Sequence, residues 1–280
     1  MSKDTHLAEV RTFYDSHPIS LPQILEKLER DGVDLDTLTE ETLQAYDQDH
    51  YSGVAANDAL AKRAGLTESD HVLDICCGLG GPARYLARNY GCRVTGVDLT
   101  ASRIEGAKRL TRMTGQADRV TFHCADAMNS PFPDDEFDVA ISQEAFCHIP
   151  DKGQVLSETA RVLKSGGRLA FTDIVATEAT SGESRERLER ELAFAGLCTI
   201  PEYCQRLERA GFTVRQADDL GEIWRDILIE RLAMYRSLKD QTVDRFGLAH
   251  FESWDSAYAF FVGQYKIGGL SGVRLLATRR

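Results

Sequence analysis

A glycine-rich turn that follows an acidic residue is the part of this sequence that most clearly implies chemistry. Asp74 lies in the apolar run Val72–Ile75 and is followed by the turn sequence CCGLGG, which occupies residues 76–81. Glycine lets a backbone approach a ligand closely because it carries no Cβ atom. A helix that starts behind such a turn offers free N–H groups to the same ligand. We therefore expect Gly78 and Gly80 to lie against a bound nucleotide.

A second acidic residue, Asp98, ends the next apolar run, 24 residues after Asp74. In nucleotide-binding α/β folds, this is where a carboxylate holds the ribose hydroxyls. Gly78, Gly80 and Ala83 satisfy a relaxed dinucleotide fingerprint, so a nicotinamide cofactor is one candidate. However, the carboxylate of Asp74 would repel a pyrophosphate and attract a cation. S-adenosyl-L-methionine (SAM) fits better, because it carries a sulfonium, an ammonium and a ribose with both hydroxyls free, and has no phosphate.

Composition narrows the classes of partner. The chain has 280 residues and a net charge of −11, which disfavours nucleic acid and anionic membrane surfaces as partners. No apolar run has the length of a membrane span, and the first ten residues lack the apolar core of a signal peptide. Seven cysteines, mostly in apolar stretches and without paired metal-knuckle spacing, predict buried reduced thiols and a cytoplasmic location. We expect a monomer or homodimer and no metal site.

Short β-rich runs alternate with helical segments from about residue 67, which predicts a parallel sheet with helices on both faces. The predicted fold class is therefore α/β, with a seven-stranded, mostly parallel Rossmann-like sheet, N-terminal helices and a helical lid insert. We predict a helix over Lys152–Gly167 that stops at Gly166 and Gly167. The expected strands are 71–75, 93–99, 120–125, 137–142, 167–175, 213–220 and a final strand near the end of the chain.

Four regions follow from this pattern. Residues 1–66 form an N-terminal helical cap, and residues 67–175 form the cofactor-binding core. Residues 176–267 form a helical substrate lid with one late strand, and residues 268–280 supply the last strand of the core sheet. Because right-handed crossovers place the carboxyl ends of parallel strands at one edge, the ligand should bind there, beneath the cap and the lid.

The turn and the segments after it resemble the class I SAM-dependent methyltransferases. The pattern Asp-x-Cys-x-Gly-x-Gly resembles their first motif, with Cys76 in place of the more usual first glycine; this replacement is compatible with the turn if Cys76 keeps an ordinary backbone conformation. The segments DAMNSPFPDDEFD (126–138), SQEAFCHIPDK (142–152) and RVLKSGG (161–167) match the family in order and spacing. The cofactor contacts that the resemblance implies come from Asp74, Cys76, Gly78, Gly80, Asp98, Leu99, Arg103, Asp126, Ala127 and Gln143.

Within that family, the chain looks like small-molecule N-methyltransferases, namely those for sarcosine or dimethylglycine and for phosphoethanolamine. The resemblance implies a substrate site that contains Glu144, His148 and Tyr51. The arginines that bind the carboxylate in the glycine branch have no clear counterpart here. Related O-methyltransferases of natural products and C-methyltransferases of quinol-like substrates share these motifs, so the motifs do not fix the acceptor atom. The acceptor is predicted to be an amine nitrogen, with oxygen or carbon as the alternative.

An amine is mostly protonated at neutral pH, so a base has to remove a proton before methylation. Histidine titrates near neutrality, and His148 is therefore the candidate base. If the segment from Glu144 to His148 is helical, both side chains share one face, and Glu144 could orient His148 or attract a cationic amine. His148 could equally be a buried structural histidine. Two other classes remain: a SAM-binding regulator without catalysis and a nicotinamide-dependent oxidoreductase.

The later aromatic residues Trp224, Tyr258 and Tyr265 have helical spacing. This pattern is more typical of a helix face in the core than of a ligand cage.

Overall fold

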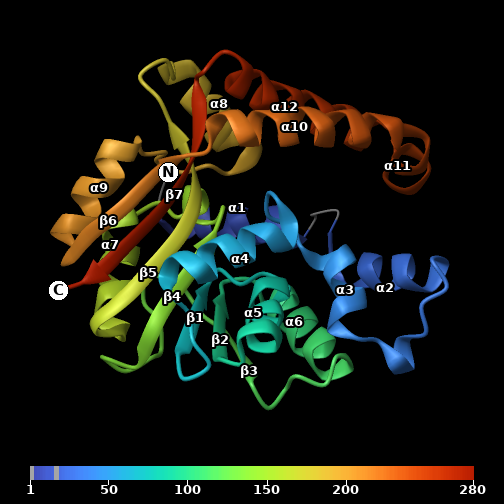
Figure 1. The fold of residues 1–280 in the computed structure, drawn as a ribbon. Helices are drawn as coiled ribbons and strands as arrows, with labels where there is room; N and C mark the ends of the chain where they lie inside the picture. Colours follow the sequence, from blue (N-terminus) through green and yellow to red (C-terminus); the bar gives the residue numbers. More distant parts are fainter. Residues whose placement is uncertain (1–2, 16–18) are drawn as a thin grey trace.

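The computed structural model describes residues 3–15 and 19–280. Within this part of the chain, one seven-stranded sheet has the order β3-β2-β1-β4-β5-β7-β6 (Figure 1). All neighbouring pairs are parallel except those made by β7, which runs antiparallel to β5 and β6. The strands are β1 (His71–Ile75), β2 (Arg93–Asp98), β3 (Val120–Cys124), β4 (Phe137–Gln143), β5 (Leu163–Ala176), β6 (Phe212–Asp219) and β7 (Leu270–Arg279).

Helices cover both faces of this sheet. Side chains alternate between the two faces along each strand, and their contacts show which helices lie on which face. On β1, Val72 faces α4, α5 and α6, whereas Leu73 faces α7 and α9. Both residues are at most 2% exposed, so the sheet is buried on both sides. The helices that flank the sheet are α4 (Gly53–Ala64), α5 (Gly81–Tyr90), α6 (Ala101–Met113), α7 (Lys152–Val162) and α9 (Ile200–Arg209).

The predicted α/β class and seven-stranded sheet are confirmed, but the helix predicted over Lys152–Gly167 was wrong in extent. The helix α7 ends at Val162, and β5 begins at Leu163 rather than at Gly167. Leu163 is fully buried and pairs with Phe137 of β4, so sheet pairing and burial override the helical pattern before the glycines are reached. The glycine pair therefore lies inside β5.

The N-terminal cap is helical within the described residues. It contains α1 (Lys3–Asp15), α2 (Leu21–Arg30), the short 3-10 helix η1 (Leu35–Thr37), α3 (Glu40–Asp47) and the flanking helix α4. Thr39 caps α3 by accepting a hydrogen bond from the Thr42 amide. The helix α1 lies in the region predicted to be helical, and residues 1–2 and 16–18 of the predicted cap lie outside the described part.

The predicted insert of residues 176–267 has two parts, one that packs with the sheet and one that extends away from it. The helix α9 and the strand β6 pack with the sheet, since Tyr203 and Leu207 belong to the same buried cluster as Phe212. By contrast, α10 (Gly221–Ser237) and α12 (Leu248–Lys266) form a long antiparallel pair that extends away from the sheet (Figure 1). The remaining helices are α8 (Gly182–Leu192) and α11 (Lys239–Phe246).

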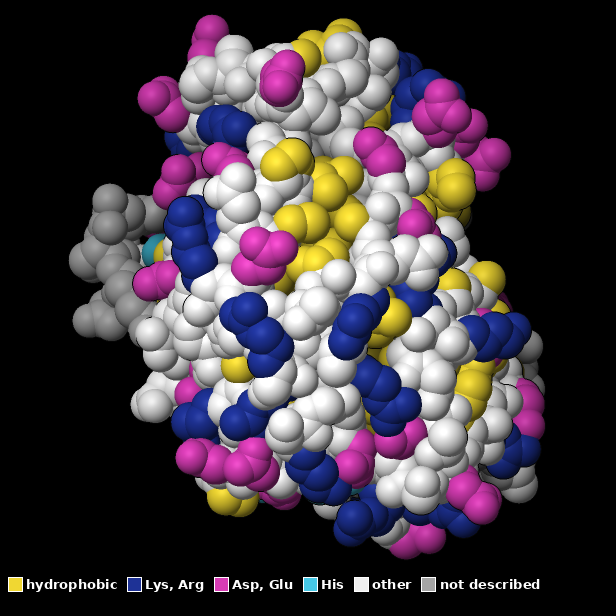
Figure 2. Space-filling model, turned by 60° about the vertical axis from the view of Figure 1, so that its left-hand side comes forward, with side chains coloured by type: hydrophobic (Ala, Val, Ile, Leu, Met, Phe, Trp, Pro, Cys, Tyr) yellow, Lys and Arg dark blue, Asp and Glu magenta, His cyan; other side chains and the backbone are white. Residues whose placement is uncertain are grey.

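The surface mixes both signs of charge. On the face in Figure 2, lysine and arginine side chains alternate with aspartate and glutamate, and a group of hydrophobic side chains lies among them. Among the helices described, none combines the length and the apolar character that crossing a bilayer requires. Of the seven cysteines, Cys124 is exposed, which corrects the prediction of a buried thiol at this position. Cys76 and Cys204 are partly buried, and the other four are buried.

Candidate active site

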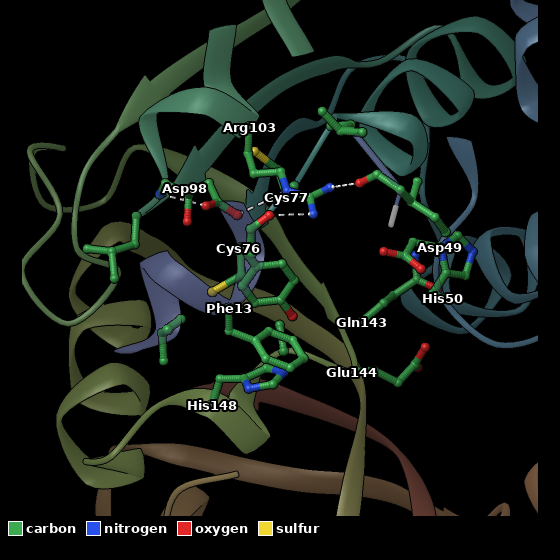
Figure 3. Close-up of a pocket in the computed structure, with 18 of the residues that line it drawn as sticks. Phe13, Asp49, His50, Cys76, Cys77, Asp98, Arg103, Gln143, Glu144 and His148 are labelled. Atoms are coloured by element: carbon green, nitrogen blue, oxygen red, sulfur yellow. Dashed lines mark hydrogen bonds between the residues drawn. The ribbon is translucent and has the colours of Figure 1, made fainter. Parts of the chain in front are cut away.

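A cavity of about 280 Å³ opens where the carboxyl ends of β1, β2 and β4 meet the cap and the insert. Asp98 and Arg103 lie toward the top of the view in Figure 3, and Glu144 and His148 lie toward the bottom, with Cys76 and Gln143 between them. We call the part built on the turn after β1 and the ends of β2 and β3 the cofactor half. We call the part around Glu144 and His148 the acceptor half.

The cavity brings together all but one of the residues that the sequence predicts for the site. Gly80 is the exception. It has a positive φ of 76°, and a Cβ atom there would come within 2.5 Å of the Phe122 ring, so its role is to let the turn pack on the sheet. The predicted residues that line the cavity are Tyr51, Asp74, Cys76, Gly78, Asp98, Leu99, Arg103, Asp126, Ala127, Gln143, Glu144 and His148.

Asp74 supplies a buried carboxyl group whose hydrogen-bonding capacity the protein does not fully satisfy. The side chain is 3% exposed, and its Oδ2 atom is buried without a hydrogen-bond partner in the structure. Burial, together with the nearby charge of Asp98, raises the pKa of Asp74 to about 8. An unpartnered buried carboxyl group beside a cavity costs free energy unless a ligand supplies a donor or a positive charge. The site therefore fits a cationic ligand at this point.

Asp98 is held in place by the turn that it faces. Its two carboxylate oxygens accept hydrogen bonds from the backbone amides of Gly78, at 3.0 Å, and Thr100, at 2.8 Å. Burial nevertheless raises the pKa of Asp98, because these amides offset only part of the desolvation. The carboxylate is thus fixed at the end of β2, where hydroxyl donors of a ribose would meet it.

Cys76 does not keep the ordinary backbone conformation that the sequence analysis required of it. Its φ is +60°, in the left-handed region that glycine adopts without cost. For a residue that carries a Cβ atom, the left-handed backbone conformation costs about 1–2 kcal/mol. The fold therefore imposes the backbone shape of the usual family glycine on a cysteine, whose thiol lines the cavity.

Arg103 holds the end of the N-terminal helix over the cavity. Its guanidinium donates hydrogen bonds to the backbone carbonyls of Ile19, at 2.6 Å, and Tyr14, at 3.1 Å. It also lies 5.3 Å from the centre of the Tyr14 ring. Asp126, at the end of β3, accepts a hydrogen bond from the Met128 amide at 2.9 Å. Arg103 thus joins α6 to the segment after α1, and Asp126 shapes the loop that carries Ala127.

Gln143 is oriented by a residue of the cap that the sequence analysis did not identify. Its Nε2 donates to Asn57 Oδ1 at 2.7 Å, and Asn57 in turn donates to Gln48 at 2.8 Å. The Gln143 Oε1 atom is then left buried without a hydrogen-bond partner in the structure. Together with Asp74, Gln143 gives the cavity two unsatisfied acceptor groups, which suits a ligand that carries N–H donors.

Glu144 is fixed by two hydrogen bonds from different parts of the chain. The Thr172 hydroxyl donates to Oε1 at 2.6 Å, and the Tyr51 amide donates to Oε2 at 2.8 Å. Burial raises its pKa to about 7, although these donors oppose the shift. The segment is a single 3-10 turn, η2 (Phe146–His148), and Glu144 precedes it with a φ of +46°. The helical arrangement considered from the sequence is therefore absent here, and the hydrogen bonds found for Glu144 are to residues other than His148.

His148 has a defined tautomer. Its Nδ1 lies 3.2 Å from the carbonyl oxygen of Ala193, which can only accept, so Nδ1 carries the proton when the ring is neutral. The lone pair of the neutral ring is then on Nε2. The ring is surrounded by aromatic groups, with centroids 5.2 Å from Phe194, 5.4 Å from Tyr14 and 5.9 Å from Phe13.

Tyr51 contacts side chains of the insert in the acceptor half of the cavity. Its ring packs against Trp224, with centroids 4.9 Å apart, and the guanidinium of Arg231 lies 4.9 Å from its centre. Arg231 also donates to the backbone carbonyls of Asp49, at 3.0 Å, and His50, at 2.8 Å. Burial, together with the nearby tyrosines, raises the pKa of the Tyr51 hydroxyl well above its usual value.

Several cavity residues were not found by sequence reasoning, and no local motif marks them. Trp224 and Tyr265 lie in the core, as their spacing predicts, but Tyr258 faces the cavity. Among the residues described, no group of three or more histidine, cysteine or acidic side chains is placed to hold a metal ion. The lining residues missed include Leu7, Val10, Phe13, Tyr14, Ile19, Asp47, Asp49, Ile174, Leu192, Phe194, Arg231, Trp254 and Phe261.

A family model described as a methyltransferase domain matches residues 73–171. A methyltransferase named GfsG from Streptomyces halstedii is 36% identical over 180 residues, which cover 61% of this chain and 63% of that protein, so the chain aligns with somewhat less than two thirds of its length. A 27-O-demethylrifamycin SV methyltransferase from Amycolatopsis mediterranei is 33% identical over 198 residues, covering 70% of this chain and 73% of that protein.

Similar folds accompany these sequence matches. A phosphoethanolamine N-methyltransferase from Haemonchus contortus, solved with SAM, superposes with a TM-score of 0.75 at 22% identity, covering 96% of this chain and 59% of that one. Proteins named as N-, O- and C-methyltransferases all occur among the relatives, so the matches do not identify the acceptor atom.

Proposed function

Because the chain belongs to the class I SAM-dependent methyltransferases, we propose that it methylates a small molecule at a heteroatom from which His148 removes a proton. The observation that carries this proposal is the orientation of the His148 ring in the acceptor half. Its Nδ1 donates to the Ala193 carbonyl, so the lone pair of the neutral ring is on Nε2, the atom that would take a proton from an acceptor in the cavity.

The cofactor half provides matching partners for SAM. Asp74 and Gln143 would accept hydrogen bonds from the ammonium group with their unsatisfied oxygens, Asp98 would hold the ribose hydroxyls, and Asp126 with Ala127 would border the adenine. SAM supplies an electrophilic methyl group on a positively charged sulfur. The protein has to hold the acceptor lone pair in line with that methyl group and to exclude water, and the apolar lining beyond His148 serves the second purpose.

An amine nitrogen is the first candidate for the acceptor atom. Glu144 supports it, because a buried carboxylate in the acceptor half would attract a cationic amine. A hydroxyl oxygen is the second candidate. It is favoured by the apolar surroundings of His148 and by similarity to an enzyme whose name specifies transfer to an oxygen.

The direct experiment follows methyl transfer from labelled SAM to a panel of amines, phosphoamines, phenols and quinols. We expect transfer to at least one of these classes, and a strong decrease in the His148→Ala variant. A preceding thermal-shift measurement compares SAM with NAD; stabilisation by NAD alone would contradict the proposal. Stabilisation by SAM without transfer to any acceptor would instead favour a regulator.

A further inference from the structure

We propose that the acceptor is an apolar molecule whose carbon skeleton packs against one wall of the cavity beside His148. This inference rests on the proposed function, because it concerns the molecule that receives the methyl group. The wall contains aliphatic and aromatic side chains from β5, α8, the loop after α8 and α12. We call it the acceptor wall, and its members are Ile174, Leu192, Phe194, Trp254, Tyr258 and Phe261.

Direct ring contacts place this wall next to the proposed base. Phe194 packs against His148, with ring centroids 5.2 Å apart, and Phe261 packs behind Phe194 at 5.5 Å. On the other side, Phe13 bridges His148, at 5.9 Å, and Trp254, at 5.5 Å. The wall therefore borders the acceptor half, so an acceptor that reaches His148 must also touch it.

Two charged side chains that contact Tyr51 are already engaged by the protein. Glu144 accepts hydrogen bonds from Thr172 and from the Tyr51 amide. Arg231 donates to the carbonyls of Asp49 and His50 and lies over the Tyr51 ring. A small zwitterion bound mainly by its charges would have to displace these internal partners, whereas an apolar skeleton gains free energy from contact with the wall as it stands.

Part of this wall is more accessible than an ordinary core surface. Ile174 and Phe261 are about 2% exposed and complete the hydrophobic cluster of the insert. Trp254 and Tyr258 are only partly buried, and both turn toward the cavity from positions four residues apart on α12. Large apolar side chains that stay partly accessible inside a cavity are typical of a surface that a ligand covers.

The test measures binding of N-phenyl-1-naphthylamine, an uncharged apolar fluorophore, to the full chain saturated with S-adenosylhomocysteine. We expect saturable binding in the micromolar range. The variant Trp254→Asp should raise the Kd of the fluorophore at least about tenfold, because a carboxylate on the wall has to be desolvated. The matched control is Ser253→Asp, which adds the same charge at an exposed neighbouring position outside the cavity and should leave the Kd unchanged.

Calorimetric titration with S-adenosylhomocysteine shows whether each variant is folded. If Trp254→Asp fails to bind it, Tyr258→Asp, with Ser256→Asp as its control, provides the same comparison. Lack of saturable fluorophore binding to the wild-type protein would overturn the inference, as would an unchanged Kd in the folded wall variant. Displacement of the fluorophore by millimolar sarcosine or ethanolamine, but not by apolar alcohols or amines, would overturn it too.

These outcomes separate this inference from the proposed function. If the labelled methyl group is transferred to small zwitterions and the fluorophore does not bind, the proposed function stands and the apolar acceptor is wrong. If the fluorophore binds as expected but no acceptor is methylated, the wall is confirmed as a binding surface and the proposed function fails.

Discussion

The two halves of the cavity differ in how the chain builds them. The cofactor half consists of strand ends and turns that lie close together in the sequence, from Asp74 to Ala127. Its specific contacts are backbone amides and carboxyl groups, such as the bond from Gly78 to Asp98. The acceptor half draws on α1, the loop before α4, the end of β4, and the helices of the insert.

The cofactor half would bind a cofactor that is constant among related enzymes, whereas the acceptor half would recognise an acceptor that varies among them. A parallel sheet brings its carboxyl ends to one edge, so the cofactor half is a consequence of the fold. The acceptor half has mainly apolar walls and depends on how separate segments pack over that edge. We therefore expect the two halves to respond independently to substitution, and the following predictions test that independence.

The largest effect is expected for the base. His148→Ala should lower kcat by about 10²–10⁴-fold, because an ammonium has no lone pair for the methyl group and a hydroxyl that keeps its proton is a weak nucleophile. The Kd for SAM, measured by calorimetry, should stay the same. His123→Ala, an exposed histidine on β3, is the control. A kcat at the wild-type level at saturating acceptor would show that His148 is structural.

The next effect concerns the ribose site. Asp98→Ala should weaken SAM binding by about 2–3 kcal/mol, or roughly 30–150-fold in Kd, through loss of a charge-assisted contact. Binding of the apolar fluorophore to the same variant, without cofactor, should be unchanged. Asp118→Ala removes an exposed carboxyl group outside the cavity and should change neither. Equal losses in both assays would mean that the two halves are coupled.

A smaller effect follows from the buried carboxyl of Asp74. The folded protein holds this proton up to a pKa of about 8, whereas the ordinary value is 3.8. The stability contributed by the protonated form is therefore complete below about pH 4 and is lost as pH rises through 8. The melting temperature of the ligand-free protein should fall between pH 5 and pH 8.5.

The variant Asp74→Asn should flatten this dependence, by at most about 1.4 kcal/mol for each pH unit. Part of the slope should remain, because burial also raises the pKa of Glu40 to about 8 and that of Glu144 to about 7. An identical slope in wild type and variant, followed by circular dichroism, would show that Asp74 does not stay protonated in the folded protein.

The smallest effect concerns backbone strain in the cofactor half. Cys76→Gly should stabilise the protein by about 1 kcal/mol, since glycine accepts a φ of +60° without steric cost. The same replacement at the neighbouring Cys77, which has an ordinary φ and is buried, should destabilise it. Thermal unfolding of both variants gives the comparison, and a loss of stability at Cys76 would mean that thiol packing outweighs the strain.

Much of the site could be predicted from the sequence, because the patterns that mark it span only a few neighbouring residues. Asp74, Gly78 and Asp98 were found from strand endings and a turn, and all three line the cavity. The conformation of Cys76 was predicted incorrectly, because the residue type favours an ordinary φ while the turn between β1 and α5 imposes a positive one. The end of α7 was misplaced for a related reason, since pairing of Leu163 in the sheet outweighed its helical context.

The sequence by itself determined the α/β class, the position of the cofactor turn and the acidic residues that face it, because strand periodicity and glycine spacing act over a few neighbouring residues. Only the tertiary structure decided that Arg231, Trp254 and Phe13 border one cavity, and that the Ala193 carbonyl fixes the tautomer of His148. The contact of Phe13 with Trp254 and that of His148 with Ala193 join segments more than 40 residues apart. They depend on how helices pack over the sheet, which no local pattern encodes.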